Sequence, residues 1–402
     1  MHISLKTINV GTGDCIVFQL SNANDKFNIL IDCGEYNANV ESCIKKLFCK
    51  HIDLLIATHI DDDHIRGLAN MLTTEDMKDL YIGNIWYNCY QHVSKNNVYF
   101  TPELKTKIEY LHTKLNTKIV KNEDIGKEKA KMLALQILSN HSWSEKWNKE
   151  IIKKGYIFQL SEGKWGIIKV IAPSESEWDK KKEDFINYFC SELLEDKWVD
   201  FDESPYLYEL LNRLMEYEKS HIPFAQDTGY TELSKHSIQS YADEHYTKDC
   251  SLNNRSSISF VWEKEGHRIL FPGDTSAENI INGLKDLYQN EKKIIFDAIK
   301  IPHHGSEHNV NKELLEYIDS SRYIIPGVKE DKRPSLQTIS RIINRPLPKD
   351  NDGNQLFTKR LIYCNAITEH MKPFINADSA LKKEFNFEFI INDINECYEE
   401  DI

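Results

Sequence analysis

No apolar run in this sequence is long enough to cross a membrane. Uninterrupted apolar stretches are short, as at Leu54–Ala57, whereas about 20 residues are needed to span a bilayer. The N-terminal residues, Met-His-Ile-Ser-Leu-Lys, lack a basic region followed by an apolar one, so no signal peptide is predicted. We therefore expect a cytoplasmic protein with no membrane partner.

Cysteine pairs with the spacing of a metal site are also absent. The chain has nine cysteines, which is an odd number, and none of them forms a C-x-x-C motif. This usage predicts reduced thiols in a cytosolic protein, and it argues against a disulfide framework or a cysteine-zinc site.

Basic residues are fewer than acidic ones. Fifty Lys and Arg against 63 Asp and Glu give a net charge of −13. This excess argues against a strongly basic, non-specific nucleic-acid binder, while a local basic groove stays open. Hydrophobic residues make up 41% of 402, which is enough for a sizeable core. At roughly 150 residues per domain, this length predicts two to three domains or one large α/β domain.

The first part of the chain alternates strand-like and turn-like segments. One segment, Glu41–Cys49, has the spacing of an amphipathic helix. The expected strands are Ile3–Val10, Cys15–Leu20, Phe27–Ile31 and Ile52–Ala57. Strands and a helix in this order predict an α/β sandwich or sheet.

Residues 101–247 have a different pattern, which is mostly helical. Only Gly155–Ala172 has strand character there. The expected helices are Pro102–Leu115, Glu128–Leu138, Ser144–Lys153 and Pro205–Lys219. Strand patterns return at Ser256–Trp262, Arg268–Phe271, Phe296–Ile301 and Tyr323–Pro326. The chain after residue 345 has no clear pattern.

The strongest local signal is the segment Thr58-His59-Ile60-Asp61-Asp62-Asp63-His64, which follows the apolar run Leu54–Ala57. Imidazole nitrogen and carboxylate oxygen are suitable ligands for zinc, manganese or iron. A strand-end loop can direct several of them to one place. The alternative is that Asp61–Asp63 simply cap the next helix.

Three distant residues strengthen the interpretation as a metal site. Asp32, Asp274 and His303 each follow an apolar, strand-like run. Active sites on sheets assemble from the loops at strand ends. A single Asp after Gly is usually a turn residue, but four such segments in one chain predict a shared site.

These motifs resemble the metallo-β-lactamase fold superfamily. More narrowly, they resemble the hydrolase domain of bacterial competence DNA-uptake channel proteins, in which Asp stands where most of the superfamily has a second His, as Asp61 does here. The resemblance covers about residues 1–75 and 250–345. Its motifs are Gly11-Thr12-Gly13-Asp14, Asp32-Cys33-Gly34, His59–His64, Asn253-Asn254-Arg255-Ser256-Ser257, Gly273-Asp274 and Lys300–Ser306.

The resemblance implies an α/β fold, a metallo-β-lactamase-type αββα sandwich with a largely helical insertion. The two halves of the fold would be residues 1–100 and 248–345, with the insertion at 101–247 and a C-terminal extension at 346–402. The insertion is expected to cover the site, recognise substrate, form a homodimer or bind a protein partner.

The resemblance also implies two divalent metal ions. His59 and Asp61 would bind the first, Asp63, His64 and His303 the second, and Asp274 would bridge them. Asp32 would orient a ligand. The third-motif His of the superfamily is absent, and either Asn253 or Asn254 stands in its place. A ligand set this rich in oxygen predicts that Mn²⁺ supports activity at least as well as Zn²⁺.

The expected reaction is hydrolysis of a phosphodiester by a metal-bound hydroxide. Asp63 would hold a metal and accept a proton, and His304 or Ser306 would steady the substrate. Arg333, in Arg333-Pro334 where the related branch often has His-Pro, would clamp a phosphate or be a structural surface residue.

Three functions stay open at this stage. The leading one is a nuclease acting on DNA, with a groove of Lys149, Lys153 and Lys154, or of Lys329, Lys332 and Arg333, offsetting the negative charge. The second is a phosphodiesterase for a small molecule such as a cyclic nucleotide. The third is a non-catalytic metal-binding partner protein. Lactam hydrolysis fits least, because the Asp-for-His replacement departs from the lactamase ligand set.

Overall fold

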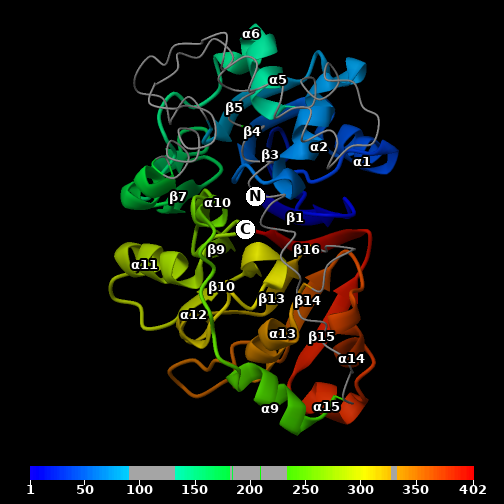
Figure 1. Ribbon diagram of the computed structural model, residues 1–402, viewed down its shortest axis with the longest axis vertical. Helices are drawn as coiled ribbons and strands as arrows, with labels where there is room; N and C mark the ends of the chain where they lie inside the picture. The colour runs from blue at the N-terminus through cyan, green and yellow to red at the C-terminus, as the bar shows by residue number, and fades with distance from the viewer. Residues whose placement is uncertain (90–131, 182, 184–208, 210–232, 327–332) are drawn as a thin grey trace, which may run out of the picture.

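The computed structural model describes residues 1–89, 132–181, 183, 209, 233–326 and 333–402. Within these residues the chain forms a six-stranded sheet, an eight-stranded sheet and a small two-stranded one. The chain ends meet, since the Ile402 amide donates to the Met1 carbonyl at 2.8 Å, and both lie near the middle of the molecule (Figure 1).

The first sheet has the order β16-β1-β2-β3-β4-β5. Its first four strands in this order pair antiparallel, whereas β3, β4 and β5 run parallel. The strands are β1 (His2–Ile8), β2 (Ile16–Ser21), β3 (Lys26–Ile31), β4 (His51–Ala57), β5 (Tyr81–Tyr87) and β16 (Ile394–Asp401).

The second sheet has the order β15-β14-β13-β11-β9-β8-β7-β6. It is parallel from β15 to β9 and antiparallel from β9 to β6. The strands are β6 (Ile157–Gln159), β7 (Ile167–Ala172), β8 (Ser259–Lys264), β9 (His267–Phe271), β11 (Ala298–Lys300), β13 (Arg322–Ile325), β14 (Arg360–Cys364) and β15 (Phe387–Ile391). The two-stranded sheet pairs β10 (Ile294–Phe296) with β12 (Ile318–Ser320).

The described helices flank the sheets. They are α1 (Ala38–Phe48), α2 (Asp62–Thr73), α5 (Leu133–Ser139), α6 (His141–Ser144), α9 (Lys235–Asp243), α10 (Leu252–Arg255), α11 (Ala277–Leu287), α12 (Lys312–Tyr317), α13 (Leu336–Ile343), α14 (Lys372–Ile375) and α15 (Ser379–Glu384), with 3-10 turns at η1 (Glu75–Met77), η3 (Pro302–Gly305) and η4 (Glu369–Met371). Among the described helices, none is long and apolar enough to cross a membrane.

The core lies in three layers, because strand side chains alternate between two faces. Along β4, Leu54 and Ile56 face the second sheet, where the same cluster includes Trp262. Leu55, between them, packs instead in the cluster that holds buried residues of α1 and α2. A third cluster joins the other face of the second sheet to α11, α12 and α13. This helix–sheet–sheet–helix order is consistent with the expected αββα sandwich, and Figure 1 shows the helices on opposite sides.

The expected helix at 102–115 lies outside the described residues, and so does the one at 205–219 apart from Glu209. The expected helix Ser144–Lys153 is wrong, because α6 ends at Ser144 and the chain beyond it is not helical. Trp147 instead forms a parallel bridge with Ile85 at the edge of the first sheet. Tertiary pairing has overridden local helical spacing there. The helical insertion as a whole therefore stays an expectation.

Strand pairing crosses the expected segment boundaries. From 101–247, β6 and β7 extend the second sheet through β8. From 346–402, β14 and β15 extend the other edge of that sheet, and β16 pairs with β1 in the first. The four-part division therefore describes the sequence, whereas the sheets draw strands from every part.

Candidate metal site

The candidate site lies where strands of both sheets end. Parallel strands place their carboxyl ends at one edge of a sheet, so residues following them converge. Asp32 follows β3 and His59 follows β4, while Asp63 and His64 open α2. From the second sheet, Asp274 follows β9, and η3 with His303 and His304 follows β11.

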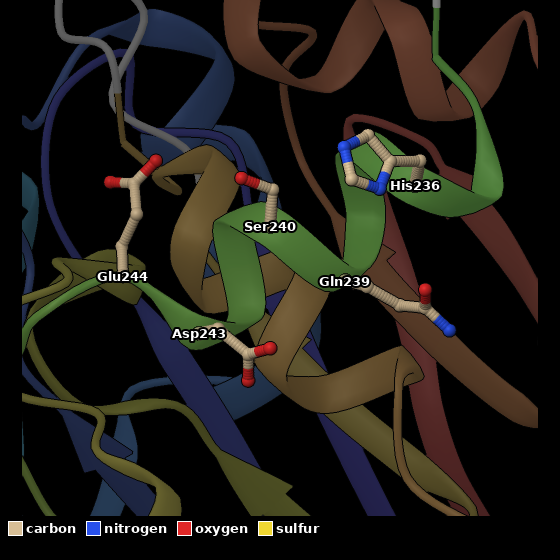
Figure 2. A pocket seen from close by; sticks show the side chains of 5 residues that line it. All are labelled: His236, Gln239, Ser240, Asp243 and Glu244. Atoms are coloured by element: carbon tan, nitrogen blue, oxygen red, sulfur yellow. The ribbon is translucent and has the colours of Figure 1, made fainter.

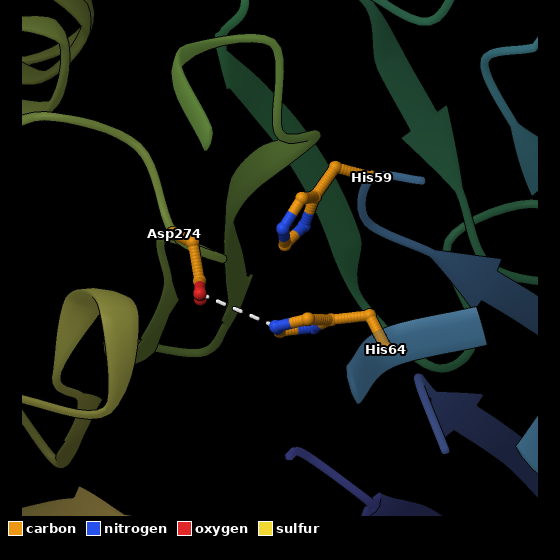
Figure 3. A group of neighbouring side chains, drawn as sticks. All are labelled: His59, His64 and Asp274. Carbon is orange, nitrogen blue, oxygen red and sulfur yellow. Dashed lines mark hydrogen bonds and ion pairs between the residues drawn. The ribbon is translucent and has the colours of Figure 1, made fainter. Parts of the chain in front are cut away.

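Imidazole and carboxylate atoms gather here in three overlapping groups. Within each group the potential ligand atoms lie within 4.8 Å of one another: His59, His64 and Asp274; Asp63, His64 and His304; and Asp14, Asp32 and His64. Figure 3 shows the first group, with His59 and His64 directed toward Asp274. His64 belongs to all three and is fully buried.

The His64 ring lies between two carboxylates, one at each ring nitrogen. Its Nδ1 lies 2.8 Å from Asp32 Oδ2, and its Nε2 lies 3.2 Å from Asp274 Oδ2. Asp32 itself accepts from the amide and the hydroxyl of Thr58, each at 2.7 Å. Asp32 therefore stands on the far side of the ring, where it fixes the ring plane and directs Nε2 into the site.

His304 has the same arrangement with different partners. Its Nδ1 lies 3.0 Å from Asp14 Oδ1, and its Nε2 lies 3.2 Å from Asp63 Oδ2. The Asp14 loop approaches α2 so closely that a Cβ at Gly13, whose φ is +100°, would lie 1.7 Å from the Asp63 carbonyl oxygen. Only glycine fits there.

Lys300 is the fully buried cation of the site. Its Nζ lies 2.6 Å from Asp14 Oδ2, 2.9 Å from Asp274 Oδ1 and 2.9 Å from the Gly273 carbonyl oxygen. Because Lys300 binds Oδ1 of Asp274, the Oδ2 atom is the one that faces the imidazoles. His64 Nε2 lies 3.2 Å and His304 Nε2 3.5 Å from Oδ2.

Charge balance dominates the ionisation of these groups. Burial opposes ionisation of Asp63, but His64, His304 and Arg333 hold its pKa well below the usual range. Burial likewise disfavours a charged His64, but Asp274, Asp32 and Asp63 raise its pKa well above the ordinary value. The ionised carboxylates are thus stabilised by positive charge placed between them.

Divalent cations would supply this positive charge. His59 Nε2 and both ring nitrogens of His304 are buried without a hydrogen bond, although carboxylates lie close to them. Buried polar atoms are normally satisfied, so ring nitrogens facing carboxylate oxygens fit cations placed between them. The residues present therefore fit the metals that the sequence predicts.

The remaining predicted ligands, Asp61 and His303, lie beside this cluster. Asp61 Oδ2 is 3.6 Å from His59 Nε2, and its Oδ1 accepts from Asn253 Nδ2 at 2.8 Å. His303 lies outside the three groups, with Nε2 4.0 Å from Asp274 Oδ2. The structure thus places His304, not His303, with Asp63 and His64.

The other predicted residues support the site or border it. Asn254 donates to Asp249 Oδ2 at 2.7 Å. Ser306 is buried, and its Oγ accepts from the His308 amide at 3.2 Å. Arg333 acts on the pKa of Asp63, so its charge reaches the site. His304 is fully buried, which separates it from bulk solvent.

Sequence reasoning assigned no role to four residues that the structure places here: Asp14, Lys300, Asp249 and Asn309. The first two stand in motifs that carried the resemblance, but the sequence does not show that they are buried and paired with each other. Asp249 and Asn309 precede and follow recognisable motifs, with no spacing signal of their own.

A surface pocket lies elsewhere, along α9. It is lined by His236, Gln239, Ser240, Asp243 and Glu244 (Figure 2). None of these residues belongs to the His and Asp cluster, so the pocket is not part of the candidate metal site.

Comparisons with known proteins give little. No family model matches the chain, and no curated protein matches it. Among solved structures, it is similar to metallo-β-lactamase SMB-1 bound to 2-mercaptoethanesulfonate, at 12% identity over 79% of this chain and 86% of that one, with a TM-score of 0.29. A likeness this weak carries no argument about fold or activity, so both rest on the topology and the site described above.

Proposed function

We propose that this chain is a metal-dependent hydrolase of phosphodiesters with a metallo-β-lactamase-type fold. The observation that supports this most is the cluster of His59, Asp63, His64, Asp274 and His304 at the strand ends of two facing sheets. Two divalent cations held there would activate water and stabilise charge on phosphoryl oxygens. His59, Asp61 and Asp274 would hold one cation, and Asp63, His64, His304 and Asp274 the other.

Asp63 is the carboxylate best placed to exchange protons with the reacting water. Its side chain is 23% exposed, whereas those of Asp14, Asp32 and Asp274 are at most 2% exposed. Asp61 is 19% exposed, but its Oδ1 already accepts from Asn253. Its depressed pKa keeps it ionised at neutral pH. An ionised carboxylate at the open side of the cluster can orient a water and accept its proton.

Arg333 is the residue we propose for binding the substrate phosphate. The Ser335 amide donates to the Gly305 carbonyl at 3.0 Å, which holds the Arg333–Ser335 segment against the turn that carries His304. A Cβ at Gly305 would lie only 2.6 Å from Pro334 Cβ. A guanidinium held beside the cluster suits a phosphate, which it can bind through two parallel hydrogen bonds.

A specific observation favours a small phosphodiester as a second candidate beside DNA. Lys153 lies 2.7 Å from Glu175, and Lys154 forms an ion pair with Asp286. Two of the three lysines of the first expected groove are therefore already neutralised. Lys329 and Lys332 of the second groove lie outside the described residues. A small substrate requires no extended basic surface.

The test uses the full chain with Mn²⁺ on plasmid DNA, linear DNA, a dinucleotide and a cyclic nucleotide. Asp63→Ala should lower turnover at least about a thousandfold, or about 4 kcal/mol of transition-state stabilisation, whereas Asp76→Ala, at an exposed carboxylate on η1, should match the wild type. Cleavage of polymers supports a nuclease, and cleavage of the small substrates alone supports the second candidate. A folded, metal-loaded protein that cleaves none of them would contradict a phosphodiesterase.

A further inference from the structure

His303 and His304 are adjacent in sequence, yet they occupy different surroundings. Both have left-handed backbone angles, with φ of +49°, and their ring centroids are 6.1 Å apart with planes inclined by 62°. The side chain of His304 is fully buried against Asp14 and Asp63, whereas that of His303 is 22% exposed. Two imidazoles so separated can serve two different ligands.

Asn309 fixes the tautomer of His303. Its Nδ2 donates to Asp249 Oδ2 at 3.0 Å, to the Asp274 carbonyl at 3.0 Å and to the Thr275 carbonyl at 3.3 Å. The amide oxygen therefore faces His303 Nδ1, at 2.9 Å. An amide oxygen only accepts, and this contact is shorter than the 3.5 Å between Nδ1 and the Asn254 amide nitrogen. The neutral tautomer that it favours has the proton on Nδ1 and a lone pair on Nε2.

That lone pair is directed at another acceptor. His303 Nε2 lies 4.0 Å from Asp274 Oδ2, which is too long for a hydrogen bond. In a tetrahedral site with Zn–N and Zn–O bonds of about 2.0–2.2 Å, two ligand atoms lie about 3.3–3.6 Å apart. A small approach of these two acceptors would therefore bring both onto one ion. His59 also has a ligand atom within 4.8 Å of Asp274, in a group that excludes His304.

The loop containing α10 contacts residues beside both His59 and His303. Asn253 holds Asp61, the partner of His59, and Asn254 holds Asp249, whose Oδ2 lies 3.5 Å from His303 Nδ1. Burial opposes ionisation of Asp249, but His303 and its hydrogen bonds lower its pKa to about 2. The pair of asparagines thus supports ligands of one metal.

From this geometry we propose that His303 binds the first metal, together with His59, Asp61 and Asp274, while His304 completes the second metal with Asp63 and His64. The adjacent imidazoles then serve separate ions, and His303 supplies the third protein nitrogen or oxygen that the first ion needs beside the bridging Asp274. Asn309 is the positioning residue for His303. The inference rests on the proposed metal-dependent function.

The test counts metal ions in purified full-length variants by elemental analysis after dialysis against limiting Zn²⁺ or Mn²⁺. Wild type should retain two ions per chain, and His303→Ala and Asp61→Ala one each. The decisive variants are doubles. His303→Ala with Asp61→Ala should still retain one ion, because both changes empty the same site, whereas His303→Ala with His304→Ala should retain none.

The opposite pattern would overturn the proposal. If His303 binds the second ion, the double variant with His304→Ala retains one ion and the double with Asp61→Ala retains none. Two ions in the single His303→Ala variant would show that His303 is no ligand at all. His308→Ala, an exposed imidazole in the same loop, is the matched control and should retain two.

Two further measurements distinguish loss of a metal ligand from misfolding and from failure of the proposed function. His303→Gln preserves bulk at a partly exposed position, so it should fold, as circular dichroism would show, and still lose one ion. If the wild type binds no metal under any condition, both the proposed function and the assignment of His303 as a ligand are wrong. Binding of two ions with no turnover would contradict the function alone and leave this ligand assignment supported.

Discussion

Two clusters of buried charge in this chain have opposite character. One is the His and Asp cluster at the strand ends, and the other surrounds Asp319 on β12. Asp319 Oδ1 accepts from Tyr323 at 2.7 Å and Arg360 Nε at 3.2 Å, and Oδ2 accepts from Arg360 Nη2 at 2.9 Å. Arg360 also donates to the carbonyls of Arg345 and Pro346. Here every acceptor meets a donor of the protein itself.

In the His and Asp cluster, the acceptors are not all paired with donors of the protein. Its carboxylates lie at ion-pair distance from His59 Nε2 and from both His304 nitrogens, but without the geometry of a hydrogen bond. Among the described residues, Lys300 is the one fully buried lysine or arginine in this cluster. A cluster that the protein closes by itself serves the fold, whereas one left short of positive charge requires a ligand. We therefore assign the Asp319 cluster to stability and propose that the His and Asp cluster serves function.

The largest effect that we predict from this comparison is that of Asp319→Asn on stability. Removing the charge leaves the buried Arg360 and the partly buried Arg345 without their counter-ion, so the free energy of unfolding should fall by about 3–5 kcal/mol. Denaturant unfolding measures this. The rise in melting temperature on adding Mn²⁺ should persist, because the metal cluster is untouched. Asp286→Asn, at an exposed ion pair, is the control and should change stability by less than about 0.5 kcal/mol. A stable Asp319→Asn variant would contradict the structural role.

The next test is the pH dependence of the same difference. Burial would raise the pKa of Asp319, but Arg345 and Arg360 outweigh it and lower that pKa. A carboxyl whose folded pKa lies below its unfolded value of about 3.9 stabilises the fold above that pH and loses this contribution as pH falls through the folded pKa. The stability gap between wild type and Asp319→Asn should stay constant near neutrality and narrow on acidification below about pH 4. A gap that widens in acid would contradict this sign.

Most strands around the site could be predicted from sequence, because their patterns are short apolar runs with a turn on each side. The expected Ile52–Ala57 and Arg268–Phe271 correspond to β4 and β9. The Asp and His residues that follow them were also identified, since ligand-type side chains at strand ends are a local signal.

What the sequence could not show depends on contacts between distant segments. The pairing of Asp14 with Lys300 joins residues 286 positions apart, and no local spacing encodes it. The choice between His303 and His304 depends on backbone angles in η3, where two left-handed residues separate the rings. The C-terminal strand β16 pairs with β1 at the other end of the chain. A local sequence pattern therefore could not predict the position of β16 in the first sheet.

The smallest effect we predict sharpens the functional side of the comparison. Arg333→Met should lower kcat/KM for the phosphodiester by about 10- to 100-fold, since hydrogen bonds to charged groups contribute roughly 1.5–3 kcal/mol. Metal content and melting temperature should stay at wild-type values, because we assign Arg333 to the substrate and not to the metals. Arg333→Lys should recover part of the loss through its charge, without the paired hydrogen bonds of a guanidinium. Unchanged kinetics in Arg333→Met would place this residue outside the substrate site. Loss of a metal ion would instead show that its charge supports the cluster through Asp63.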